Sequence, residues 1–165
     1  MSRVGEVVLV NFPFTSGASE KVRPALVLGC SDANPDDLSL AYITTQVDRY
    51  IALPSVVLLS QDDLESGTLR VSSLIRLDKV ALINASLLTV LARLKPAKTQ
   101  EVLRAYTKLA TRMFAAEKFL APSFTPGQSV VPPSGKVIGA KELQNMVEAS
   151  QIGRASCRER VYVLV

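Results

Sequence analysis

An arginine before a proline is the first residue of this sequence whose type and setting suit chemistry on a phosphate. Arg23 stands directly before Pro24, and a proline restricts the residue before it to extended backbone. An extended backbone holds the planar guanidinium in one direction, which suits a fixed fork of donors that binds a phosphate. The plainer alternative is a surface arginine beside a polar loop, and spacing alone favours that alternative.

Two threonines and a glutamine, Thr44, Thr45 and Gln46, end an apolar stretch. A hydroxyl at the end of a strand can donate to a phosphate oxygen or accept from a ribose hydroxyl. Threonine is also a common strand residue without any chemical role, so the pair by itself is only a weak indication.

A second polar group contains Arg70, Ser72 and Arg76, followed by Lys79. Strand alternation places Arg70, Ser72 and Leu74 on one face, and Arg76 joins them only if the strand runs on unbroken. The alternative is an ordinary solvated basic face.

Composition excludes several classes of protein. The 165 residues contain no histidine, which excludes Ser-His-Asp triads, histidine general bases and histidine-ligated zinc. Two cysteines are too few for a disulfide framework and favour a reducing cytoplasm. The net charge of +4 is mild and neither demands nor excludes RNA. No apolar run reaches the ~18 residues of a membrane span, and we expect no cofactor, metal or membrane partner.

Short strands must position the candidate residues. Apolar and β-branched runs, separated by turn-forming clusters, predict strands over residues 5–14, 24–30, 38–45, 55–60 and 72–77. Their regular spacing favours a small barrel or sandwich over alternating βαβ units. Residues 84–91 are expected to form a turn or a short helix.

A helix is expected from Pro96, a residue that fits the first turn of a helix. Apolar residues then recur at steps of three and four, which predicts one face packed on the barrel. These residues are Val102, Leu103, Tyr106, Leu109, Ala110, Met113 and Phe114. From Ala121 onward frequent proline and glycine predict an extended tail, with a brief helix over 141–150.

Several sequence blocks, in this order, resemble the MazF/PemK (Kid) toxins of bacterial type II toxin–antitoxin systems. The resemblance covers residues 1 to about 112. The blocks are Gly5-Glu6-Val7-Val8, Asn11-Phe12-Pro13-Phe14-Thr15, Arg23-Pro24-Ala25-Leu26-Val27-Leu28, Ile43-Thr44-Thr45-Gln46 and Leu74-Ile75-Arg76-Leu77-Asp78-Lys79.

The resemblance implies an α+β fold, a small SH3-like β-barrel with a C-terminal helix and an unstructured tail. It also implies a homodimer that cleaves single-stranded RNA without a metal and is inhibited by a cognate antitoxin. Arg23 and Thr44 fall at the positions of the family's catalytic arginine and threonine. The residues expected to bind RNA are Thr15, Lys21, Thr45, Gln46, Arg70, Ser72 and Arg76.

One position departs from the family pattern. Some members also use a later arginine with a nearby acid, and Arg70 falls on that arginine. Ser72 stands at the position of the acid, which leaves the identity of the general base open.

The tail resembles other sequences. Residues 124–150 are similar to the N-terminal arm of a DegT-type sugar aminotransferase/dehydratase of lipopolysaccharide synthesis, without that enzyme's cofactor pocket. Residues 152–161 are similar to a translated sequencing adapter, so we expect Cys157 to have no functional role. The expected division is a toxin domain over 1–115, a Pro/Gly-rich tail over 116–151 and an artefactual or disordered terminus over 152–165.

The sequence therefore predicts a toxin endoribonuclease of the cytoplasm. The main alternative is a non-catalytic SH3-like module that binds nucleic acid or protein. A role in sugar-nucleotide metabolism, suggested by the tail alone, lacks any cofactor-binding segment.

Overall fold

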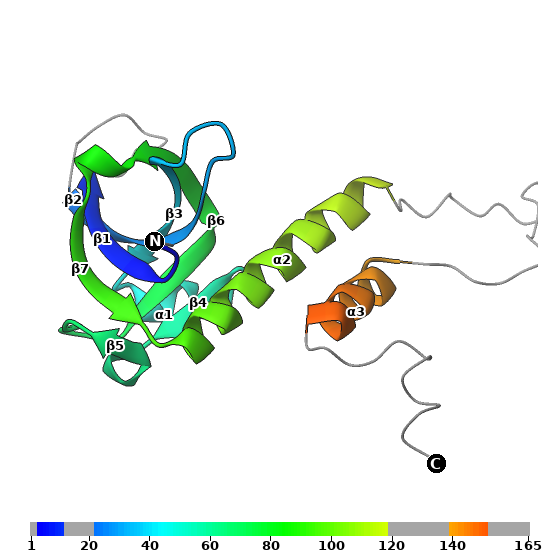
Figure 1. Ribbon diagram of the computed structural model, residues 1–165. Coiled ribbons are helices and arrows are strands. Elements are labelled where there is room, and N and C mark those ends of the chain that lie inside the picture. Colours follow the sequence, from blue (N-terminus) through cyan, green and yellow to red (C-terminus); the bar gives the residue numbers. More distant parts are fainter. Residues whose placement is uncertain (1–2, 12–21, 119–138, 152–165) are drawn as a thin grey trace, which may run out of the picture. The chain divides into compact units, whose positions relative to one another are not determined.

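The computed structural model describes residues 3–11, 22–118 and 139–151 (Figure 1). Thr15 and Lys21, two of the expected RNA-binding residues, lie outside this part. The described chain divides between Tyr106 and Thr107 into two units. The first holds the strands and the start of the long helix, and the second holds the rest of that helix and a shorter one.

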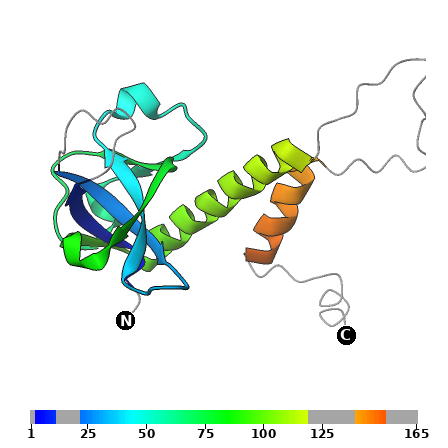
Figure 2. The same cartoon turned by 90° about the horizontal axis from the view of Figure 1, so that it is seen from above.

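The first unit is a curled antiparallel sheet with short helical connections (Figure 1). Within the described residues the sheet has seven strands in the order β4-β6-β3-β2-β1-β7-β5. The strands are β1 (Glu6–Asn11), β2 (Val22–Cys30), β3 (Asp37–Thr44), β4 (Val56–Leu59), β5 (Leu64–Ser66), β6 (Ser73–Asn84) and β7 (Thr89–Leu94). Figure 2 shows the same strands from above, wrapped around a shared interior. This arrangement confirms the α+β barrel that the family resemblance implied, and it decides for the barrel between the barrel and the sandwich that the strand spacing had left open.

Alternation along the strands builds the core of the sheet. Every second side chain of a strand points to the same face, and the fully buried pairs follow this rule on three adjacent strands. The pairs are Val8 and Val10 on β1, Ala25 and Val27 on β2, and Leu38 and Leu40 on β3. Their burial fixes the register, because a slip by one residue would turn each pair to the other face.

Among the described residues, three short helical elements connect strands, and a long helix follows the last strand. They are the helical turn α1 (Val47–Tyr50), the 3₁₀ turns η1 (Gln61–Asp63) and η2 (Ala85–Leu87), and the helix α2 (Pro96–Lys118); α3 (Ala140–Gln151) lies in the second unit. The structure corrects the expectation of a turn or helix over 84–91. Only 85–87 are helical, and β7 begins at Thr89, where its backbone pairs with β1.

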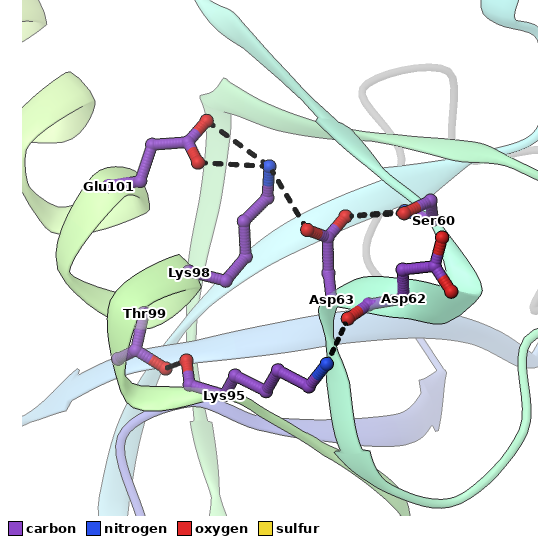
Figure 3. A network of polar contacts seen from close by, with 7 residues as sticks. All are labelled: Ser60, Asp62, Asp63, Lys95, Lys98, Thr99 and Glu101. Atoms are coloured by element: carbon purple, nitrogen blue, oxygen red, sulfur yellow. Dashed lines mark hydrogen bonds and ion pairs between the residues drawn. The ribbon is translucent and has the colours of Figure 1, made fainter.

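A polar network joins the start of α2 to η1 (Figure 3). The Asp63 carboxylate accepts from the amide and the hydroxyl of Ser60, and Lys98 Nζ lies 3.7 Å from Asp63 Oδ1. Lys95 Nζ donates to the Asp62 carbonyl at 2.6 Å. Burial would raise the pKa of Asp63, but the hydrogen bonds from Ser60 and the charge of Lys98 outweigh it and hold the pKa below its usual value. The turn η1 is thereby fixed to the helix.

The apolar stripe of α2 follows expectation only in its first part. Val102 is buried in the first unit, whereas Met113 is 66% and Phe114 is 52% exposed. The prediction of one face packed on the barrel along the whole stripe is therefore wrong for its C-terminal end. Tyr106 is the last residue of the first unit, and Met113 and Phe114 belong to the second unit.

The second unit contains the predicted tail helix, observed as α3. Lys108 Nζ of α2 forms a 2.8 Å ion pair with Glu148, and Gln144 Nε2 donates to the Lys108 carbonyl. In the described ranges no helix is both long and apolar enough to span a bilayer.

Candidate functional site

Neighbouring strands bring the candidate arginine and threonine together. Ala25 of β2 is the partner of Tyr42 of β3, and the same antiparallel register places Arg23 opposite Thr44. On the next strand, Arg76 of β6 is the partner of Tyr42. Because side chains of paired residues share a face, the side chains of Arg23, Thr44 and Arg76 belong to one face of three adjacent strands.

These residues line a cavity of about 250 Å³, here called the arginine cavity. Of the predicted site residues it contains Arg23, Thr44, Thr45, Gln46 and Arg76; its other lining residues are Pro24, Tyr42, Ile43, Tyr50 and Lys79. Two arginines and a lysine make the cavity cationic, and hydroxyls supply neutral donors and acceptors. Such a set of groups suits an anion with several oxygens, such as a phosphodiester.

The Thr44 hydroxyl is held by the chain that follows it. Thr44 is 6% exposed, and its Oγ1 accepts a hydrogen bond from the Gln46 amide at 3.2 Å. A hydroxyl has one proton to donate besides its acceptor lone pairs. With an acceptor lone pair engaged by Gln46, the hydroxyl proton is the part of Thr44 best placed to meet a substrate oxygen.

Arg76 is held on two sides. Its Nε donates to Asp78 Oδ1 at 2.8 Å and its Nη2 donates to Oδ2, while its guanidinium carbon lies 4.3 Å from the centre of the Tyr50 ring. The side-chain bond to Asp78 raises the pKa of Arg76, and the same bond lowers the pKa of Asp78. Arg76 is thus a fixed, permanently charged group, although it is 7% exposed.

An irregularity in β6 creates this arrangement. Consecutive residues Ala41 and Tyr42 of β3 pair with Val80 and Arg76 of β6, so the three residues between them bulge from the ladder. A bulge redirects the side chains near it, and Asp78 lies within this one. The sequence signal for this pair was the Arg-x-Asp spacing, which places both side chains on one face of a strand. Asp78 and Tyr50 are the residues that sequence reasoning missed.

Arg70 and Ser72 lie elsewhere, which corrects their expected alignment with Leu74 on one strand face. The strand β6 begins only at Ser73, so alternation does not extend back to them. Arg70 lines a second cavity of about 640 Å³, and Ser72 is exposed and lines neither cavity. Arg76 therefore lines the same cavity as Thr44, whereas Arg70 lines the other cavity. Asp78 is a carboxylate beside this group, and it accepts hydrogen bonds from Arg76.

The described residues contain no group of three His, Cys, Asp or Glu side chains that could hold a metal ion. The curled antiparallel sheet defines a small β-barrel protein, with a cationic, hydroxyl-bearing cavity that suits an anion. The sequence profile of the PemK-like, MazF-like toxins of type II toxin–antitoxin systems matches residues 3–109. The chain belongs to this family.

Two further similarities involve individual proteins. The solved structure of Mycobacterium tuberculosis toxin MazF-mt6 is similar to this chain with 20% identity and a TM-score of 0.45, over 63% of this chain and 94% of that one. The lipopolysaccharide biosynthesis protein RfbH of Salmonella typhimurium is 53% identical over 55 residues. These residues are 33% of this chain but only 13% of RfbH. This short match agrees in part with the resemblance of the tail to an enzyme of lipopolysaccharide synthesis.

Proposed function

We propose that this toxin cleaves single-stranded RNA without a metal, with Arg23 and Thr44 as its catalytic residues and Arg76 as a third group in the site. The observation that carries the proposal is the convergence of these three side chains on the arginine cavity. Family membership supplies the reaction class, since MazF/PemK-like toxins are endoribonucleases. Thr45 and Gln46, which also line the cavity, would contact the RNA backbone beside the cleaved phosphate.

The reaction needs no histidine. The ribose 2′-oxygen attacks the adjacent phosphorus and loses its proton to water, and the bond from phosphorus to the 5′-oxygen breaks. The products are a 2′,3′-cyclic phosphate and a 5′-hydroxyl, whose oxygen takes up a proton from water while hydrogen-bonded to Arg23. The Thr44 hydroxyl donates to a non-bridging oxygen, and the arginines stabilise the negative charge that grows there.

Asp78 and Tyr50 act through Arg76. The bidentate contact with Asp78 and the ring of Tyr50 fix the guanidinium before the substrate arrives. A cation that is already oriented loses little free energy to reorganisation as charge develops in the transition state. The lowered pKa of Asp78 makes it a weak base, which favours this positioning role over proton abstraction.

The test is cleavage of an unstructured RNA by the purified protein in the presence of a chelator, with analysis of both new ends. We expect 2′,3′-cyclic phosphate and 5′-hydroxyl ends. A matched RNA with one 2′-deoxynucleotide at the cleaved position should resist cleavage there, because it lacks the attacking oxygen. Binding of RNA without any cleavage would refute the proposal and favour a non-catalytic SH3-like binding module.

We further propose that the toxin works in the cytoplasm as a homodimer and is inhibited by a cognate antitoxin. The first unit exposes large apolar side chains on β6, η2 and β7, among them Leu82 at 59%, Leu87 at 68% and Val90 at 50%. Exposed apolar groups of this kind are common where proteins associate. Sedimentation should show a dimer at micromolar concentration, and an acidic antitoxin segment should inhibit cleavage stoichiometrically. A strict monomer that no neighbouring gene product inhibits would contradict this.

A further inference from the structure

Tyr42 is a residue of the arginine cavity that the mechanism above does not use. Strand pairing puts it in the middle of the site, since Ala25 of β2 is its partner on one side and Arg76 of β6 is its partner on the other. Side chains of paired residues share a face, and the side chain two positions further along a strand returns to that face. Thr44 and Arg23, each two positions from this row of partners, therefore lie on the same face as Tyr42.

The row that contains Tyr42 leaves room beside the ring. Ala25 is fully buried and contributes only a methyl group at the partner position. Diagonal neighbours on adjacent antiparallel strands are ~7–8 Å apart, which aromatic and long side chains can span. Tyr42 is thus within reach of Arg23 diagonally across β2 and of Arg76 directly across on β6.

The Tyr42 side chain meets two kinds of surroundings. It packs against the apolar core cluster that includes Val10, Ala25 and Leu40, and it lines the cationic arginine cavity. A tyrosine has an apolar ring and a single polar atom at its tip, so it is suited to such a boundary. Tyr42 is half-buried, and its ring satisfies the core. The hydroxyl is the part of the side chain that suits the cavity.

A second hydroxyl donor supplies what the rest of the cavity lacks. A guanidinium has five N–H groups, and Arg76 gives two of them to Asp78. The Thr44 hydroxyl has one proton to donate. Negative charge grows on both non-bridging oxygens of the phosphate during cleavage, and fixed donors aimed at such charge stabilise the transition state. Two hydroxyls on neighbouring positions of one strand face can serve the two oxygens.

We propose that Tyr42 is a further catalytic residue, whose hydroxyl donates a hydrogen bond to one non-bridging oxygen of the cleaved phosphate while Thr44 donates to the other. This inference rests on the proposed function, because it takes the arginine cavity as the site of cleavage. The contact transfers no proton. The phenol keeps its hydrogen, and the hydrogen bond strengthens as charge grows on the oxygen.

Sulfur substitution of one oxygen at a time tests this assignment. The full chain is given a short RNA with chelator present, and the cleaved phosphate is identified. Two further RNAs are the Rp and Sp phosphorothioate diastereomers at that phosphate. Sulfur accepts hydrogen bonds more weakly than oxygen does, so the wild-type protein should cleave both diastereomers more slowly than the all-oxygen RNA. The measurement is the single-turnover rate at saturating toxin.

Two variants and a control separate the two oxygens. Tyr42→Phe keeps the ring on the core and removes the hydroxyl, so it should lower the rate on the all-oxygen RNA about 10–100-fold with little change in RNA affinity. One diastereomer should then lose most of its slowing by sulfur, and the other should keep it. Thr44→Val should show the reverse pattern. Tyr106→Phe is the matched control, because Tyr106 is a half-buried tyrosine of α2 that lines neither cavity.

The outcomes separate this inference from the proposed function. Absence of RNA cleavage by the wild-type protein would refute both. Cleavage with the expected ends, but at the wild-type rate in Tyr42→Phe, would refute only the assignment of Tyr42, as would unchanged slowing of both diastereomers in that variant. Slowing of the wild-type protein by sulfur in one diastereomer alone would also overturn the assignment, and this result depends on no variant. Loss of the slowing in one diastereomer only, in Tyr42→Phe but not in Tyr106→Phe, would support it.

Discussion

Replacement of Thr44 by valine separates the chemistry of the site from its folding. Valine keeps the branched shape of the side chain and removes only the hydroxyl. Thr44 is 6% exposed, and its hydroxyl oxygen accepts a hydrogen bond from the Gln46 amide at 3.2 Å. One lost hydrogen bond lowers the free energy of unfolding by about 0.5–1.5 kcal/mol. Because Gln46 is exposed, water can satisfy its amide, which places the loss at the lower end of that range. The melting temperature should fall by roughly 2–4 °C.

The effect on cleavage should be far larger than the effect on stability. A hydroxyl that donates to the developing phosphorane oxygen is an electrostatic contact of the kind whose removal lowers kcat about 10²–10³-fold. The measurement is single-turnover cleavage of a short RNA at saturating toxin, with chelator present, together with a melting curve. RNA affinity should change little, because the contact strengthens only in the transition state.

Thr45→Val is the matched control, since Thr45 is exposed and follows Thr44 on the chain. Thr45 lines both cavities, and we expect a much smaller change in kcat for this variant. The reasoning would be refuted if Thr44→Val cleaved RNA at the wild-type rate. A rate loss in Thr45→Val alone would move the catalytic hydroxyl to the next position of the chain.

Three other predictions follow from the same structure. Arg23→Ala should abolish cleavage with a melting temperature close to wild type, and retained cleavage would remove Arg23 from the mechanism. The pKa of Asp78 is lowered in the folded protein, so its stabilising contribution is present above the pKa of the unfolded state, near 4, and is lost as the pH falls through the lower folded value. Acid titration should therefore show a shallower loss of stability for Asp78→Asn than for the wild type. Parallel titration curves for the two proteins would contradict this. Deletion of residues 120–165 should leave cleavage unchanged and shift the melting temperature by at most a few degrees, because α3 contacts α2 through the exposed Lys108–Glu148 ion pair and the hydrogen bond from Gln144 to the Lys108 carbonyl. A large loss of stability would show that the tail supports the barrel.

Local patterns in the sequence were sufficient for most of the elements. The strands that contain Val8, Ala25 and Leu40 were predicted because each combines β-branched or apolar runs with flanking turn residues. The helix from Pro96 was predicted because its apolar residues recur at steps of three and four, and because proline fits the first turn of a helix. β7 was missed because its apolar run, Val90-Leu91-Ala92, is short and does not alternate with polar residues.

Local patterns also explain the errors at Arg70 and Ser72. Alternation was extended backward from Leu74 as if one strand ran through all three positions, but backbone pairing begins only at Ser73. Where a strand starts depends on the partner strand beside it, and a partner distant in sequence leaves no mark on the residues themselves. The same limit applies to the bulge at Asp78, which is defined by its offset from β3.

The sequence by itself determined the residue types available for chemistry: it contains no histidine, and it has an arginine before a proline and a threonine at the end of an apolar run. It also determined that these would be held by short strands, since propensity and period act within a few residues. Only the tertiary structure decided that Arg76, and not Arg70, lies with Arg23 and Thr44, and that Asp78 and Tyr50 hold it. Proximity across β2, β3 and β6 depends on strand order and register, which arise from burial of the whole core and from no single segment.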